Sequence, residues 1–143
     1  IVHCSATREN QHIDIETIRK WHVDGRGWSD VGYHYVIYLD GTIAKGRADN
    51  RQGAHCLKSN PFSLGICYIG GDETHGKTPK DTRTEAQKES LNHLLHTLKA
   101  MHPEAIIHGH RDFAAKACPS FDATLEYKPI SNKYEDESRD EDT

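Results

Sequence analysis

Long apolar runs, bulky apolar side chains and an excess of positive charge are all scarce in this sequence. No apolar run approaches the about 20 residues that a helix needs to cross a bilayer, and only one Met and three Phe occur among 143 residues. The mean hydropathy is -0.80 and the formal net charge is -4. We therefore expect no membrane-spanning segment and no membrane partner. The negative charge also argues against general nucleic-acid binding, which usually needs a basic protein.

Cysteine is too sparse for a disulfide-stabilised secreted domain. Cys4, Cys56, Cys67 and Cys118 form no CxxC pair. If one of them binds a metal, three remain, and three cannot all pair. We interpret the others as reduced, partly buried thiols. A chain of 143 residues buries enough of its surface to fold as one domain, and we expect a monomer, without such cross-links.

The first residue is Ile1 rather than Met, and it lies inside an expected strand. We expect that upstream residues are missing, and no export signal is visible in the chain. The reduced thiols favour synthesis in the cytoplasm.

Hydrophobic periodicity predicts two helices. Asp14 can cap a helix of about ten residues, and the apolar face of that helix would consist of Ile15, Ile18 and Trp21. Thr84 and Gln87 form a capping box at the start of a longer helix that ends before Pro103. Its apolar stripe, which should face a core, consists of Leu91, Leu94, Leu95, Leu98 and Met101.

Short β-rich runs alternate with these helices. The expected strands cover residues 1–4, 35–39, 42–45, 64–69 and 105–108, and Asp40-Gly41 predicts a hairpin turn. Residues 47–63 are interpreted as a long functional loop. This order favours an α/β single domain with a central mixed β-sheet flanked by α-helices. Residues 131–143 contain six acidic residues, so we expect a disordered tail after a domain of residues 1–130.

Histidine is the abundant residue, with 11 copies. Most of them lie in polar or helical surroundings, where surface histidine is the ordinary interpretation. His3, on an expected strand, and His110 and Cys118, in the loop after residue 108, are possible metal ligands. Two imidazoles and a thiolate suit zinc, and three protein ligands leave a position for water. Spacing alone leaves open that Cys118 is a small buried core residue.

Two further places in the sequence could carry chemistry. Tyr33 and His34 lie where a loop enters an expected strand. They are either ordinary aromatic residues at the edge of a sheet, or they place a phenol and an imidazole at a cleft. Lys116 precedes Cys118 by two residues. A loop lysine is normally solvated, but a lysine beside a bound cation could stabilise a developing oxyanion.

A series of short motifs, in order along the chain, resembles the phage-type N-acetylmuramoyl-L-alanine amidases, whose fold is shared by peptidoglycan recognition proteins. The resemblance extends from Ile1 to about Asp122, and the ordered set is far more specific than any single motif. The motifs are HCSAT at 3–7, IRKWH at 18–22, GW at 27–28, DVGYH at 30–34, DGT at 40–42, SLGIC at 63–67, GG at 70–71 and KACPSFD at 116–122.

The resemblance implies a zinc amidase that acts on peptidoglycan in the cell wall, with one zinc ion per chain in a surface groove. The implied zinc ligands are His3, His110 and Cys118, and the implied catalytic residues are Tyr33 and Lys116. The implied groove residues that bind substrate are His34, His55 and Asn60. Some relatives use a glutamate as general base, and no matching glutamate is found here.

Three other functions are alternatives to this one. Some members of the recognition family bind peptidoglycan without cutting it, but they lack the cysteine ligand that Cys118 provides. A phage member of the family also inhibits RNA polymerase, so the resemblance alone implies this second partner. The third alternative is a cysteine hydrolase that uses Cys118 with His110; Pro119 follows the cysteine, so no helix N-terminus is clearly aimed at its sulfur.

Overall fold

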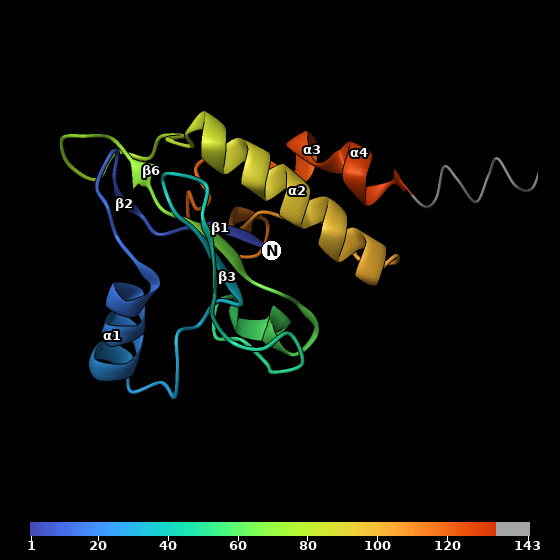
Figure 1. Cartoon of the computed structure of the whole chain (residues 1–143), viewed down its shortest axis with the longest axis horizontal. Helices are drawn as coiled ribbons and strands as arrows, with labels where there is room; N and C mark the ends of the chain where they lie inside the picture. Colours follow the sequence, from blue (N-terminus) through green and yellow to red (C-terminus); the bar gives the residue numbers. More distant parts are fainter. Residues whose placement is uncertain (134–143) are drawn as a thin grey trace, which may run out of the picture.

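Figure 1 shows the computed structural model, in which a small central sheet carries helices on both faces. Residues 1–133 are described. The main sheet has the strand order β1 (Val2–Cys4), β5 (Ile66–Tyr68), β3 (Tyr35–Ile37) and β4 (Ile43–Lys45). The first three strands are parallel, and β4 joins β3 as an antiparallel hairpin. The predicted α/β domain with a central mixed sheet is confirmed.

A second, smaller sheet extends this framework. The strands β2 (Thr7–Arg8) and β6 (Gly71–Asp72) continue from β1 and β5 and pair with each other in parallel. Neither segment is among the strands predicted from the sequence, because two-residue strands carry no detectable alternation.

Helix α2 (Glu85–Met101) covers one face of the main sheet (Figure 1). The predicted capping box is present: the Thr84 hydroxyl accepts from the Gln87 amide, and the Gln87 side chain accepts from the Thr84 amide. Four of the five predicted stripe residues are buried in the core that α2 forms with the sheet. Met101 is 60% exposed because it is the last residue of the helix, so the predicted stripe was one residue too long.

Helix α1 (Ile15–Arg26) covers the opposite face. Asp14 caps it by accepting from the Thr17 amide, and the helix ends at Gly27, whose φ of 71° is in the left-handed region that glycine tolerates. Ile15 and Ile18 are buried, whereas Trp21 is 46% exposed. The predicted apolar face was therefore wrong at Trp21, because a step of six residues places it about 120° around the helix from Ile15.

The predicted strand at residues 105–108 is also wrong. A single bridge joins Val2 to Gly109, and the Val2 amide donates to the His108 carbonyl at 2.8 Å. Two further backbone groups of the segment bind side chains: the Ile107 amide donates to the Ser131 hydroxyl, and the Ala105 carbonyl accepts from the Lys99 ammonium. A ladder cannot form where side chains occupy these groups.

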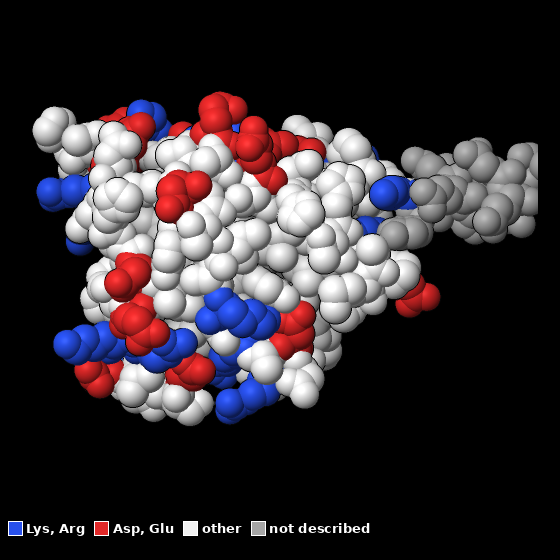
Figure 2. Space-filling view, in the orientation of Figure 1, with Lys and Arg blue, Asp and Glu red and all other residues white. Residues whose placement is uncertain are grey.

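Two short helices, α3 (Ala123–Glu126) and α4 (Lys128–Ser131), pack beside α2. Two 3-10 turns, Leu57–Phe62 and His110–Asp112, complete the described elements. Ser131, the first residue of the predicted acidic tail, is buried in α4, and residues 134–143 lie outside the described part. Within residues 1–133 no helix has the length and apolar character that a membrane crossing requires. Acidic side chains gather over α2 in Figure 2, and most of the visible basic ones lie on the lower half of that face.

The Arg83 side chain fastens the start of α2 to the C-terminal helices. It is 2% exposed and forms ion pairs with Asp81 at 2.9 Å and with Glu126 at 2.6 Å. It also donates to the Tyr127 hydroxyl at 2.8 Å, and its guanidinium lies 3.4 Å from the centre of the Phe121 ring. Because Phe121 follows the Cys118 loop closely, this cluster holds one end of the segment that carries two predicted ligands.

We expect Arg83→Leu to lower the free energy of unfolding by about 2–4 kcal/mol, because it leaves partly buried acceptors without their cation. The matched control is Lys80→Ala, which removes an exposed ion pair with Glu9 and should cost less than about 1 kcal/mol. Urea unfolding of both variants measures the difference. Equal losses for the two would contradict the assigned role of Arg83.

Candidate metal centre and active site

The alternation of side chains along β1 directs His3 away from the core that lies under α2. Val2 and Cys4 belong to the core under α2, so His3, between them, points to the other face of the sheet. In register, His3 lies beside Cys67, and both share the face that packs towards α1. His3 is only 2% exposed, so the strand holds its imidazole inside the protein with little freedom to move.

His110 and Cys118 reach the same point from the C-terminal segment. The Arg111 amide donates to the Cys118 carbonyl at 2.8 Å, which closes the loop between them, and the Cys4 amide donates to the Cys118 sulfur at 3.2 Å. One ligand atom from each of His3, His110 and Cys118 lies within 4.8 Å of the others. The structure therefore brings together three predicted ligands from opposite ends of the chain, and they could hold a metal ion.

The protonation of this cluster suits a metal ion. Burial, followed by the positive charges of His55 and His110, lowers the pKa of His3 well below 6.5. Burial and then Lys116 lower the pKa of His110. Both imidazoles are thus neutral at pH 7, which is the form that binds metal. A hydrogen bond with the Cys4 side chain, followed by burial, raises the pKa of the Cys118 thiol, whereas the Cys4 amide lowers it by a smaller amount. A metal ion must therefore displace the thiol proton.

Tyr33 lies against the cluster. Its ring centroid is 5.2 Å from that of His3, and burial raises the pKa of its phenol well above 10, so the hydroxyl keeps its proton. His22, to which sequence reasoning gave no role, packs against Tyr33 with a centroid separation of 5.7 Å and accepts from the Gly32 amide at 2.9 Å. The one sequence signal for His22 was its place in the IRKWH motif.

Glycine is required just before Tyr33. A Cβ atom at Gly32 would lie 2.1 Å from the Ala54 carbonyl oxygen, and the Ala54 amide donates to the Gly32 carbonyl at 3.0 Å. This close contact between two loops fixes the backbone position of Gly32 and therefore of Tyr33, which follows it.

The three predicted groove residues lie in one region but in different environments. His34 is completely buried: its Nδ1 accepts from the Gly65 amide at 3.0 Å and its Nε2 faces the Arg51 carbonyl at 2.7 Å. The Asn60 Oδ1 accepts from the amides of His55 and Cys56. We infer that His34 and Asn60 act by holding these loops, since their polar atoms are engaged with backbone, while His55 contacts His3 directly at 2.8 Å.

Lys116 is exposed beside His110. Its own amide donates to the Ala114 carbonyl at 2.8 Å, which shapes the tight turn before Cys118. The ammonium can therefore reach solvent next to the predicted ligands, where a substrate could approach.

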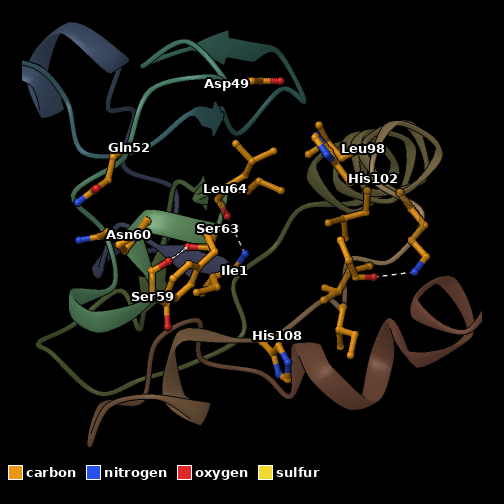
Figure 3. Close-up of a pocket in the computed structure, with 18 of the residues that line it drawn as sticks. Ile1, Asp49, Gln52, Ser59, Asn60, Ser63, Leu64, Leu98, His102 and His108 are labelled. Atoms are coloured by element: carbon orange, nitrogen blue, oxygen red, sulfur yellow. Dashed lines mark hydrogen bonds between the residues drawn. The ribbon is translucent and has the colours of Figure 1, made fainter.

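A hollow of about 820 Å³ is lined by residues of the 57–62 turn and of the end of α2. Figure 3 shows Ile1, Leu64, Ser63 and Asn60 on one wall of this hollow and the end of α2 on another. Among the described residues, His3, His110 and Cys118 do not line it. The hollow is therefore not a groove around the cluster.

Comparison with known sequences gives a consistent result. The family model described as N-acetylmuramoyl-L-alanine amidase matches residues 1–121. The endolysin of Enterobacteria phage K11 is 45% identical over 121 residues, which cover 85% of this chain and 79% of that protein. The endolysin of Escherichia phage T7 matches with the same identity and coverage.

Solved structures share the fold. The N-acetylmuramoyl-L-alanine amidase LysC from Clostridium intestinale aligns with a TM-score of 0.73 and 28% identity, over 94% of this chain and 82% of that one. Bumblebee PGRP-SA aligns with a TM-score of 0.74 and 26% identity, over 89% of this chain and 77% of that one. Both are similar to this chain along nearly its whole described length.

We expect the metal-free protein to lose stability as the pH falls below about 6.5. Burial lowers the pKa of His22 to about 4 and that of His55 to about 3, so between pH 6.5 and these values the unfolded chain binds protons that the folded chain does not. The free energy of unfolding should fall by at least about 1.4 kcal/mol per pH unit, the value for one proton. Urea unfolding in a chelator between pH 7 and pH 4.5 measures it; a flat profile would contradict the burial of these imidazoles.

Proposed function

The chain belongs to the N-acetylmuramoyl-L-alanine amidase family and is an amidase that acts on peptidoglycan, and from this premise we propose that it is a zinc enzyme. His3, His110 and Cys118 would hold one zinc ion per chain. The observation that carries the proposal is the convergence of these three side chains, with their ligand atoms within 4.8 Å of one another.

The donor set fits zinc. Two imidazoles and one thiolate are ligands that zinc prefers, and three protein ligands are typical of catalytic sites, in which a fourth position stays open. Both imidazoles are held neutral by burial, so only Cys118 has to release a proton when metal binds. Zinc at such a site supplies a Lewis acid that activates water and polarises a carbonyl group.

The substrate amide joins the lactyl group of N-acetylmuramic acid to L-alanine. Hydrolysis adds water to the lactyl carbonyl carbon, places negative charge on its oxygen, and releases the alanine amine with one proton. Lys116, exposed next to His110, would stabilise that oxygen through its positive charge. We place the substrate at this exposed edge of the cluster.

Tyr33 would act as a hydrogen-bond donor. Burial raises the pKa of its phenol, so the neutral hydroxyl can orient water or the departing amine while remaining protonated itself. His22 and Gly32 set the position of the Tyr33 ring. In this assignment the proton that the leaving amine needs comes from the attacking water, which Tyr33 would orient, and no glutamate is involved.

A metal-free cysteine hydrolase is the weaker alternative. Nucleophilic attack needs a thiolate, whereas a hydrogen bond with the Cys4 side chain and burial raise the pKa of Cys118. A second activity towards RNA polymerase remains an expectation from resemblance, and no described residue is assigned to it.

We expect Cys118→Ser to weaken zinc binding by more than the about 10–100-fold typical for loss of an outer-shell partner, and to abolish release of peptides from purified peptidoglycan. Cys56→Ser is the matched control, because Cys56 is buried outside the cluster, and it should keep both properties. Metal analysis and mass spectrometry of the digest measure them. Full activity of metal-free Cys118→Ser would end the zinc proposal.

Lys116→Ala should keep its zinc while the turnover number falls by about 10²–10³-fold, since one electrostatic partner of the developing oxyanion is removed. The control is Lys58→Ala, which changes an exposed lysine in the 57–62 turn and should leave turnover unchanged. Loss of zinc from Lys116→Ala, or unchanged turnover, would show that the role given to Lys116 is wrong.

A further inference from the structure

We propose that His55 is a positioning residue for the metal centre, which fixes the His3 ring so that Nδ1 of His3 is the nitrogen presented to the metal. The proposal rests on the zinc site described above and assigns to His55 a role other than the substrate contact that the sequence implied. It states which ring nitrogen of His3 bears the proton. It is supported by a series of hydrogen bonds that leads from His3 away from the metal ligands.

The two nitrogens of His3 face different partners. Nδ1 lies 3.8 Å from the Cys118 sulfur, on the side where the ligand atoms gather, and Nε2 lies 2.8 Å from Nδ1 of His55. A nitrogen that binds metal cannot carry a proton, so Nε2 would carry it and donate to His55. A separation of 3.8 Å between nitrogen and sulfur is compatible with one ion bound to both at the usual lengths of about 2.0–2.3 Å.

The hydrogen bonds beyond His55 have one consistent direction. Nε2 of His55 lies 3.4 Å from the Ser63 hydroxyl. That hydroxyl donates to the Ser59 carbonyl at 2.7 Å, and Figure 3 draws this bond between Ser63 and Ser59. A carbonyl can only accept, so the single Ser63 proton is used there, and the Ser63 oxygen accepts from Nε2 of His55. His55 then has a bare Nδ1, which must accept from His3.

The fold makes a fitted space for the His55 ring. A Cβ atom at Gly65 would lie 2.5 Å from Cγ of His55, and a Cβ atom at Gly53 would lie 2.7 Å from its Cδ2, so only glycine leaves room at both positions. The Asn60 side chain accepts from the His55 amide at 3.0 Å. His34 completes the support, because its ring binds the Gly65 amide and faces the Arg51 carbonyl.

This support has a chemical consequence for the metal. A ligand imidazole whose second nitrogen donates to a fixed acceptor keeps one tautomer and one ring orientation, and it becomes a stronger donor. Here a chain of hydrogen bonds would run from Ser59 through Ser63 and His55 to His3. Residues of the long loop predicted at 47–63 would thus influence a metal ligand on β1. His34, His55 and Asn60 would thus act together on the metal centre.

The first test compares zinc dissociation constants, measured by competition with a chelating dye, for the wild type, His55→Phe and His55→Asn. His55→Phe fills the space without an acceptor and should weaken zinc binding about 10–100-fold. His55→Asn returns an oxygen near the place of Nδ1 and should recover part of the loss. His93→Phe, an equal change at an exposed position of α2, is the control and should bind like the wild type. Binding of His55→Phe within twofold of the wild type would overturn the proposal.

The second test reads the tautomer directly, by ¹⁵N NMR of the His3 and His55 rings in metal-free and zinc-loaded wild type. We expect protonated Nε2 on both rings in both states, with Nδ1 of His3 changing on zinc addition. A proton on Nδ1 of His3 or of His55 would overturn the proposal. If His55→Phe does not fold, the wild-type spectrum decides the proposal alone. If the wild type bound no zinc, the proposal of a zinc enzyme would be wrong. The metal-free spectrum would still show whether His3 donates a hydrogen bond to His55.

Discussion

The site depends on the position of β1 between two different partners. On one side β1 pairs in parallel with β5, and on the other the Val2 amide donates to the His108 carbonyl next to the bridge at Gly109. That single contact puts His110 one step beyond the bridge and close to His3. Together with the Cys4 amide that donates to the Cys118 sulfur, this contact holds the C-terminal segment beside β1, where His110 and Cys118 meet His3.

The surrounding structure serves to keep this arrangement rigid. The Cys4 amide holds the Cys118 sulfur, and the Arg83 cluster anchors the chain that follows through Phe121 and Glu126. On the far side, the 53–65 segment supports His3 through His55. Burial keeps the imidazoles neutral, so the folded protein offers lone pairs where exposed histidines would partly be cations. Such preorganisation lowers the cost of assembling ligands when metal binds.

Much of the fold followed from periodicity and capping. The capping box at Thr84 and the leucine stripe located α2 and its buried face, and Asp40-Gly41 located the β3–β4 hairpin. The errors were at places where tertiary contacts decide. Side chains bind the Ala105 carbonyl and the Ile107 amide, which opposes a strand at residues 105–108, and the short β2–β6 pair exists because β1 and β5 are extended side by side.

The candidate ligands could be predicted from residue type. Their proximity in space was expected only from the family resemblance, because a sequence separation of more than 100 residues carries no geometric information. The links from His55 to His3 and from His22 to Tyr33 depend on side-chain packing across loops. No local pattern in the sequence could reveal either link.

X-ray absorption at the zinc edge of the loaded protein tests the central claim most directly, because it counts the donor atoms around the ion. The account predicts one sulfur at about 2.3 Å and two imidazole nitrogens at about 2.0–2.1 Å, with one light atom from solvent. A zinc shell without sulfur, or one with two or more sulfurs, would contradict it.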